Sequence, residues 1–210
     1  MVKLPHKSLE RELLTQGYTC IVGLDEVGMA CLAGPVVVGA ALFRPKFYAG
    51  RWRKLQYLRD SKLLQAKQRE RYAHELASNP FIRHAIAIVH PREVDRRNVY
   101  HAALAGMRRA LQRVGLRKND RPFVLVDGRG RIPKIPWPQQ AIVKGDRKVF
   151  SIAAASVLAK VHRDAMMVRY ATRYPGYGFE VHKGYPTKMH RQRLAELGMS
   201  QLHRKSFHVH

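Results

Sequence analysis

The sequence predicts an α/β fold in which a mixed β-sheet is flanked by helices. Two observations support this prediction. Apolar runs of strand length alternate with helical segments in the order strand, strand, helix, strand, helix, strand, strand, helix. In addition, no linker, internal repeat or low-complexity tract divides the 210 residues. We therefore expect one domain over residues 1–210, with a small helical region at its C-terminal end.

The first two strands are expected to form a β-hairpin. Residues 18–24 form an apolar strand that runs into Asp25-Glu26, and residues 34–43 form a second, buried strand. A Gly-containing turn joins them. Residues 44–60 are rich in Lys and Arg, and we expect them to form a basic loop.

The next segment is expected to fold as helix, strand and helix. Asp60-Ser61 supplies an N-cap for a polar helix over residues 63–77, which Asn79-Pro80 ends. Residues 84–89 form the third strand. Residues 93–114 form a short turn and a longer helix with one apolar face.

The C-terminal half adds two strands and two helices. The expected elements, in order, are a strand over 122–126, a Pro-rich loop over 132–138, a strand over 141–143, an Ala-rich helix that opens at 144–146 and runs to about 170, a Gly- and Tyr-rich loop over 174–186, and a helix that Thr187 caps and that ends near 197. The remaining tail is rich in His and Arg.

Charge indicates the class of partner. The chain has 39 Lys and Arg against 15 Asp and Glu, a formal net charge of +24. Such an excess favours nucleic acid, because basic side chains displace the counterions of phosphates. Apolar residues, at 46%, are too many for a disordered chain. No apolar run is long enough for a membrane span, and no signal peptide is recognisable.

The cysteine content indicates the compartment. Cys20 and Cys31 are the only cysteines, and they form neither a disulfide framework nor a zinc motif. We therefore expect a cytoplasmic protein without a membrane partner. A monomer is the simplest assembly.

Three acidic sites share one sequence context. Asp25-Glu26, Asp127 and Asp146 each lie at the C-terminal end of an apolar strand, where the side chains of an open α/β sheet converge on ligands. Four carboxylates in one place repel one another unless cations neutralise them. Such oxygen ligands suit Mg²⁺ or Mn²⁺, and two such ions can promote the hydrolysis of a phosphodiester.

Each of these acids also has a simpler interpretation. Asp25 is compatible with a hairpin turn, and Asp127-Gly128 with an ordinary Asp-Gly turn. Asp146 is compatible with an N-cap of the helix that follows it. Taken singly, the residues leave the choice open, whereas their shared position favours a metal site.

Several sequence blocks occur in a fixed order along the chain. They are 25–28 with 32–37, 60–62, 124–128, 143–146, 153–161 with 163–164, 177–179, 182–187 and 203–207. In these blocks the chain resembles type 2 ribonuclease H, the ribonuclease HII family. The resemblance implies a ribonuclease H-like fold, with Asp25, Glu26, Asp127 and Asp146 as catalytic ligands of Mg²⁺ or Mn²⁺.

The same resemblance implies a substrate and a product. The substrates would be RNA–DNA hybrids and ribonucleotides embedded in duplex DNA, cut by two-metal-ion hydrolysis to leave 5′-phosphate and 3′-hydroxyl ends. This activity would start ribonucleotide excision repair. The resemblance also implies substrate contacts for Ser61, Lys62 and Tyr185, with Tyr185 against the sugar that follows the ribonucleotide. A tyrosine folded over the core remains the alternative.

Other residues are weaker candidates for the site. Lys183, together with His182 and Arg204, could contact the nucleic-acid backbone. Ser156, Lys160 and Asp164 are spaced by four and share a face of the predicted helix, so Lys160 and Asp164 are placed for an intrahelical pair. We expect these three residues to lie behind the metal site, and we assign the fourth ligand to Asp146 in preference to Asp164.

Gly28-Met29-Ala30 differs from the ribonuclease HII family that the chain resembles. That family has Gly-Arg-Gly at this position and uses the segment to bind the ribose 2′-hydroxyl. Met29 lacks the guanidinium, and Ala30 carries a Cβ that is strained if its φ is positive.

Three functions remain open. They are a ribonuclease HII-like enzyme, a hybrid-cleaving ribonuclease H without junction specificity, and a nucleic-acid-binding protein without catalysis.

Overall fold

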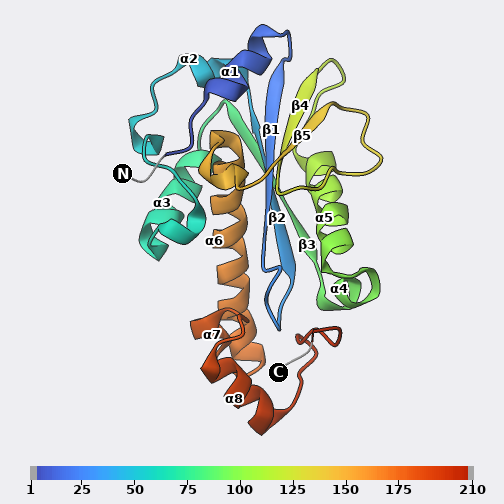
Figure 1. The fold of residues 1–210 in the computed structure, drawn as a ribbon. Helices are drawn as coiled ribbons and strands as arrows, with labels where there is room; N and C mark the ends of the chain where they lie inside the picture. The colour runs from blue at the N-terminus through green and yellow to red at the C-terminus, as the bar shows by residue number, and fades with distance from the viewer. Residues whose placement is uncertain (1–3, 208–210) are drawn as a thin grey trace.

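The computed structural model describes residues 4–207, which contain a five-stranded mixed sheet in the order β3-β2-β1-β4-β5 (Figure 1). The strands are β1 (Cys20–Val27), β2 (Val36–Phe43), β3 (Ile82–Val89), β4 (Pro122–Asp127) and β5 (Gln139–Ile142). The hairpin of β1 and β2 is antiparallel, and so is the pairing of β2 with β3. By contrast, β4 is parallel to β1 and β5 is parallel to β4. The C-terminal ends of β1, β4 and β5 therefore lie at the same end of the sheet.

Helices cover both faces of the sheet (Figure 1). One face carries α6 (Phe150–Arg173) with α3 (Ala66–Ala77), and the other carries α5 (Val99–Arg113) with α4 (Pro91–Arg97). The short α7 (Phe179–His182) and α8 (Lys188–Leu197) extend beyond the end of the sheet and form the expected C-terminal helical region. Among residues 4–207, no helix combines the length and the apolarity that crossing a membrane requires.

Two glycines allow α6 to approach the sheet closely. A Cβ built on Gly23 of β1 would lie 2.2 Å from the backbone of Ser151, and one on Gly39 of β2 would lie 2.4 Å from the carbonyl oxygen of Ala155. The Ala-rich sequence of α6 presents small side chains to this surface. The close contact brings Ser156 of α6 beside the C-terminal end of β1.

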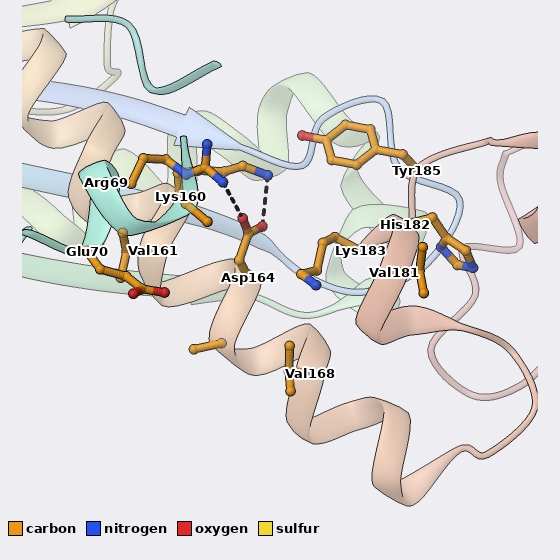
Figure 2. Close-up of a pocket in the computed structure, with 12 residues that line it drawn as sticks. Arg69, Glu70, Lys160, Val161, Asp164, Val168, Val181, His182, Lys183 and Tyr185 are labelled. Carbon is orange, nitrogen blue, oxygen red and sulfur yellow. Dashed lines mark hydrogen bonds and ion pairs between the residues drawn. The ribbon is translucent and has the colours of Figure 1, made fainter. Parts of the chain in front are cut away.

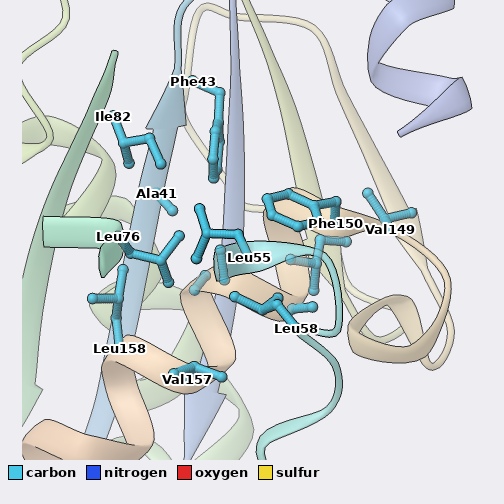
Figure 3. Close-up of a cluster of buried hydrophobic side chains, with 14 of the residues drawn as sticks. Ala41, Phe43, Leu55, Leu58, Leu76, Ile82, Val149, Phe150, Val157 and Leu158 are labelled. Carbon is cyan, nitrogen blue, oxygen red and sulfur yellow. The ribbon is translucent and has the colours of Figure 1, made fainter. Parts of the chain in front are cut away.

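An apolar cluster fills the space between the sheet and α6 (Figure 3). Its members include Phe47, Tyr48, Leu55 and Leu58, all buried, which lie in the segment predicted to be a basic loop. That prediction was wrong: the segment contains α2 (Pro45–Ala49) and a 3₁₀ turn. Burial of these side chains outweighs the surrounding positive charge, since each large apolar side chain contributes about 2 kcal/mol when buried.

Some helix boundaries differ from the predictions. Helix α3 begins at Ala66, where Gln65 forms a capping box with Gln68, whereas the Asp60 side chain accepts a hydrogen bond from the Lys62 N–H and caps a 3₁₀ turn. Helix α6 begins at Phe150, and a separate 3₁₀ turn covers residues 145–147. The predicted cap at Thr187 is confirmed, because its hydroxyl accepts a hydrogen bond from the His190 N–H.

Helix α1 (Ser8–Thr15), like the short helices α2 and α7, was not predicted. The helix places the buried carboxylate of Glu10 at the N-terminus of α6, where it accepts a hydrogen bond of 2.9 Å from the Ser151 N–H. The positive end of the α6 dipole favours a negative charge in this position. Helix α1 thus fixes the start of the helix that carries Ser156.

We predict that Gly23→Ala lowers the free energy of unfolding by about 3 kcal/mol, because the added methyl group overlaps the α6 backbone. Gly17→Ala is the matched control. Its φ of +90° also disfavours a side chain, but the added Cβ meets only Arg121 Nη1, at 3.7 Å, so that the cost should be about 1 kcal/mol. Urea denaturation measures both variants, and equal losses would contradict the proposed role of the close contact.

Candidate active site

The predicted acids lie at the C-terminal ends of the three parallel strands. Asp25 and Glu26 are within β1, Asp127 is the last residue of β4, and Asp146 lies in the 3₁₀ turn that follows β5. Leu24 pairs with Val126 across the parallel strands. The residues that follow this pair, Asp25 and Asp127, are therefore neighbours across the sheet.

Hydrogen bonds hold Asp25 in place. Its side chain is buried, one of its oxygens accepts a hydrogen bond of 2.7 Å from the Glu26 N–H, and the neighbouring Ser156 hydroxyl acts to lower its pKa. Ser156 is in turn 2.9 Å from the hydroxyl of Ser61, which is also buried. The Ser61–Ser156 pair connects the segment around Lys62 with the acid on β1.

Hydrogen bonds also hold Asp127 and the turn that carries Asp146. Asp127 accepts a hydrogen bond of 2.6 Å from the Gly145 N–H, which ties the end of β4 to this turn. Arg147 of the same turn donates through Nε to Asp60 at 3.1 Å, and Asp60 also accepts from the Lys62 N–H at 2.9 Å. Asp146 does not have the helix N-cap role that its sequence position also allowed, because Val149 is the N-cap of α6.

Burial and mutual repulsion raise pKa values in this cluster. Burial, followed by the charges of Glu26 and Asp127, raises the pKa of Asp25 well above its usual range. Burial and Asp127 raise the pKa of Glu26 to about 7, and burial raises the pKa of Asp146 to about 6. The ammonium of Lys62 lowers the pKa values of Glu26 and Asp146. The acids thus share one electrostatic field, although no three His, Cys, Asp or Glu side chains within residues 4–207 are already arranged around one ion position.

A cavity of about 220 Å³ collects most of the predicted site residues. Its lining is Asp25, Glu26, Val27, Gly28, Met29, Ala30, Ser61, Lys62, Ser156, Lys160 and Tyr185. The residues come from β1, the loop after it, the turn before α3, helix α6 and the loop after α7. One surface thus carries two of the four acids, two lysines, an aromatic ring and open backbone, whereas Asp127 and Asp146 are not part of the lining.

Backbone geometry resolves the question about Ala30. The positive φ in this segment falls on Gly28, at +95°, and Ala30 has no positive φ. A Cβ on Gly28 would lie 2.4 Å from Arg163 Nε, so this position requires glycine. Ala30 is exposed and unstrained. Met29 is half-buried and packs against an apolar cluster that also contacts Phe207.

A second cavity, of about 490 Å³, shares Lys160 and Tyr185 with the first (Figure 2). Lys160 donates a hydrogen bond of 2.8 Å to Asp164, as their spacing predicts. Arg69 of α3 lies 3.6 Å from the same carboxylate, and Lys183 lies on the opposite wall. Asp164 is therefore held in a basic setting and is absent from the group of acids that perturb the pKa of Asp25.

Two weaker candidates are not substrate contacts in this structure. His182 is buried and bonds to the Tyr177 carbonyl and the Gly184 N–H. Arg204 is buried and donates to three carbonyl groups of residues 28–34. Neither is available to a phosphate. Their sequence setting, a basic segment in a basic chain, gave no sign of burial.

Three buried histidines support the loop that carries Tyr185. The His182 ring stacks on that of His190, which donates to the Tyr185 carbonyl at 2.9 Å and contacts the tilted ring of His203 at 3.2 Å. Burial, with the neighbouring His190, lowers the pKa of His203 to about 4. Sequence reasoning missed this cluster, because its members are brought together only by the packing of α7, α8 and the tail.

The sheet order and the acids at its C-terminal end define a ribonuclease H-like fold. The structure matches the ribonuclease H2 of Pyrococcus horikoshii with a TM-score of 0.75 and 24% identity, over 90% of this chain and 94% of that one. It matches the ribonuclease HII of a complex with PCNA from Archaeoglobus fulgidus with a TM-score of 0.71 and 25% identity, over 90% and 96% of the two chains.

The sequence identifies the family. The sequence model of the ribonuclease HII family matches residues 22–210. The chain is 43% identical over 189 residues to the ribonuclease HII of Chlorobium phaeobacteroides, covering 90% of each protein. It is 45% identical over 199 residues to that of Myxococcus xanthus, of which it spans 64%. The chain belongs to the ribonuclease HII family and is a ribonuclease H, an endonuclease that cleaves RNA–DNA hybrids. This membership removes the alternative of a non-catalytic binding protein.

We predict that Asp25→Asn raises the free energy of unfolding by about 1–2 kcal/mol at pH 8 in the presence of a chelator, and the melting temperature by about 4 °C, because it removes a buried charge from among other acids. A raised carboxyl pKa means that the folded state binds more protons than the unfolded state. The wild type should therefore lose stability as pH rises from about 4.5 through the folded pKa of Glu26, about 7.

The matched control for this prediction is Asp164→Asn. Asp164 lies on the face of α6 that also carries Ser156, and it is paired with Lys160, so its neutralisation should lower the melting temperature. Thermal denaturation between pH 5 and pH 8 measures both variants. A melting temperature of Asp25→Asn at or below that of the wild type at pH 8 would contradict the electrostatic cost assigned to the cluster.

Proposed function

We propose that this ribonuclease H hydrolyses both continuous RNA–DNA hybrids and single ribonucleotides embedded in duplex DNA, leaving 5′-phosphate and 3′-hydroxyl ends. The observation that carries the proposal is the group of mutually repelling acids beside a cavity that also holds Lys62, the Gly28-Met29-Ala30 backbone and Tyr185. The net charge of +24 supports a duplex nucleic acid as the partner.

The acids fit divalent cations. Their donors are carboxylate oxygens, and burial together with mutual repulsion makes their ionised forms costly, a cost that bound cations would remove. Asp25, Glu26, Asp127 and Asp146 would hold Mg²⁺ or Mn²⁺. When bound, two such ions supply activation of a water and stabilisation of the leaving oxygen.

The chain's own residues bind and orient the substrate in this proposal. Lys62 is exposed and close enough to the acids to affect their pKa values, so it can hold a phosphate beside them. The Tyr185 ring lies 5.3 Å from Lys160 Nζ, and burial raises the Tyr185 pKa to about 12, which keeps the phenol neutral. Its ring can then pack against a sugar, an interaction that does not depend on base sequence.

The assembly and compartment stay predictions. We infer that residues 1–210 act as one catalytic domain, with residues 174–210 as its substrate-contacting region, and that the protein is a cytoplasmic monomer. Cys20 and Cys31 are free and buried, which supports a reducing compartment.

The second candidate is a hybrid-cleaving enzyme without junction specificity. Met29 favours it, because its side chain packs against apolar residues and offers no charge to the substrate. In this case the enzyme would need several consecutive ribonucleotides for tight binding.

We predict that the purified protein with Mg²⁺ or Mn²⁺ cuts two labelled duplexes, one with a single ribonucleotide and one a continuous hybrid. Cleavage of the continuous hybrid alone would leave only the second candidate. Asp25→Asn should lower kcat by at least about a thousandfold, since it removes a ligand charge, while duplex binding stays equal or becomes tighter. Unchanged cleavage by this variant would remove Asp25 from the metal site.

We predict that Met29→Arg raises kcat/KM for the single-ribonucleotide duplex about tenfold relative to the continuous hybrid, because a guanidinium at this edge of the cavity adds a charge-assisted hydrogen bond. Met189→Arg adds the same charge to an exposed position on α8 and serves as the control. Equal changes in both variants would assign the effect to net charge alone.

A further inference from the structure

Two arginines are buried without a carboxylate partner. The exposed fraction is 0% for Arg163 of α6 and 1% for Arg204 of the tail after α8, and within residues 4–207 neither forms an ion pair with an acid. Burial of a guanidinium is costly unless its N–H groups are satisfied. The partners of these two groups therefore indicate what their burial achieves.

All of the partners are carbonyl oxygens around one loop. Arg204 donates to Gly28 at 2.7 Å, to Met29 at 2.9 Å and to Gly34 at 3.0 Å. Arg163 donates to Pro35 at 2.9 Å, to Ala33 at 3.2 Å and, two residues before Tyr185, to Lys183 at 2.8 Å. The two guanidinium groups thus bind the 28–35 loop from its buried side, and Arg163 joins it to the loop of Tyr185.

The opposite side of the loop is left with free donors. The N–H groups of Met29 and Ala30 donate to no acceptor among residues 4–207, and both residues line the cavity that contains Asp25 and Glu26. With the carbonyl groups engaged by arginines, this segment offers N–H groups and a positive field, which suit an oxygen of a ribose hydroxyl or phosphate. Since Met29 supplies no guanidinium of its own, recognition here depends on the backbone.

We propose that Arg204 is a positioning residue for ribonucleotide recognition, which fixes the Gly28-Met29-Ala30 backbone so that its N–H groups meet the ribose. The inference rests on the proposed role of this segment in binding the ribonucleotide. The tail is itself anchored, because Asp95 of α4 accepts hydrogen bonds from the Lys205 N–H at 3.1 Å and the Ser206 N–H at 2.9 Å. Helix α4 thereby holds Arg204 against the loop.

Binding without cleavage tests the proposal. In EDTA, fluorescence anisotropy would measure the affinity for a duplex with one ribonucleotide and for the same duplex made only of DNA. We expect the wild type to prefer the first. Arg204→Lys keeps the charge but has one nitrogen in place of three, and it should reduce this preference about tenfold, as loss of one hydrogen bond would, while affinity for the all-DNA duplex changes less than twofold.

Two further variants keep the test decisive. Arg193→Lys alters an exposed arginine of α8 whose carboxylate partner is Glu196, and it should leave both affinities unchanged. Asp95→Ala releases the tail without touching the buried guanidinium, and it should reduce the preference about threefold. If Arg204→Lys fails to fold, as judged by its urea midpoint, Asp95→Ala carries the test.

The outcomes separate the inference from the proposed function. The inference alone is overturned if folded Arg204→Lys still prefers the ribonucleotide-containing duplex as strongly as the wild type does. If Arg204→Lys does not fold, the same result for Asp95→Ala overturns it. An equal loss of affinity for both duplexes also overturns it, because that result indicates a merely structural role. A wild type with no preference for the ribonucleotide overturns both the inference and the proposed recognition of single ribonucleotides.

Discussion

The parallel pairing of β1 with β4 is the constraint on which the site depends. It sets Asp25 beside Asp127, two acids far apart in the sequence, and the Gly145 hydrogen bond to Asp127 then places Asp146 next to them. The arrangement concentrates negative charge at a buried position, which opposes folding. Apolar clusters on both faces of the sheet offset that cost. The folded state therefore keeps the carboxylates close together despite their mutual repulsion, and the side chains that stabilise it take no part in the chemistry.

Much of the fold and the acids of the site could be predicted because they depend on local pattern. The β1–β2 hairpin, the Thr187 cap and the Lys160–Asp164 pair all follow from residues within a few positions of one another. The acids were found because each lies at the C-terminal end of an apolar strand or just after it. The basic segment before Asp60 was mispredicted, since its charges are conspicuous in sequence whereas the burial of Phe47 is decided by the facing helix.

The contacts that sequence reasoning missed are those in which a side chain bonds to backbone atoms, including those of Arg204 and His182, which the sequence suggested as nucleic-acid contacts. Arg163 and Arg204 resemble any other arginine in a chain with 39 basic residues, and carbonyl groups leave no trace in the sequence. The buried histidines have the same property, because His182 and His190 bond mainly to main-chain groups. The residue types of a site can thus be read from sequence more readily than the contacts that orient them.

The dependence of the 28–35 loop on Arg163 and Arg204 has a consequence for biosynthesis. The ribosome makes the loop before it makes α6 and the segment after α8, which supply the guanidinium groups that satisfy the loop carbonyls. The residues of the β1–β2 hairpin are therefore all present before the residues that bind the loop. A stop codon between α8 and Arg204 would remove one of the two guanidinium groups from the loop while leaving all five strands of the described sheet in the polypeptide.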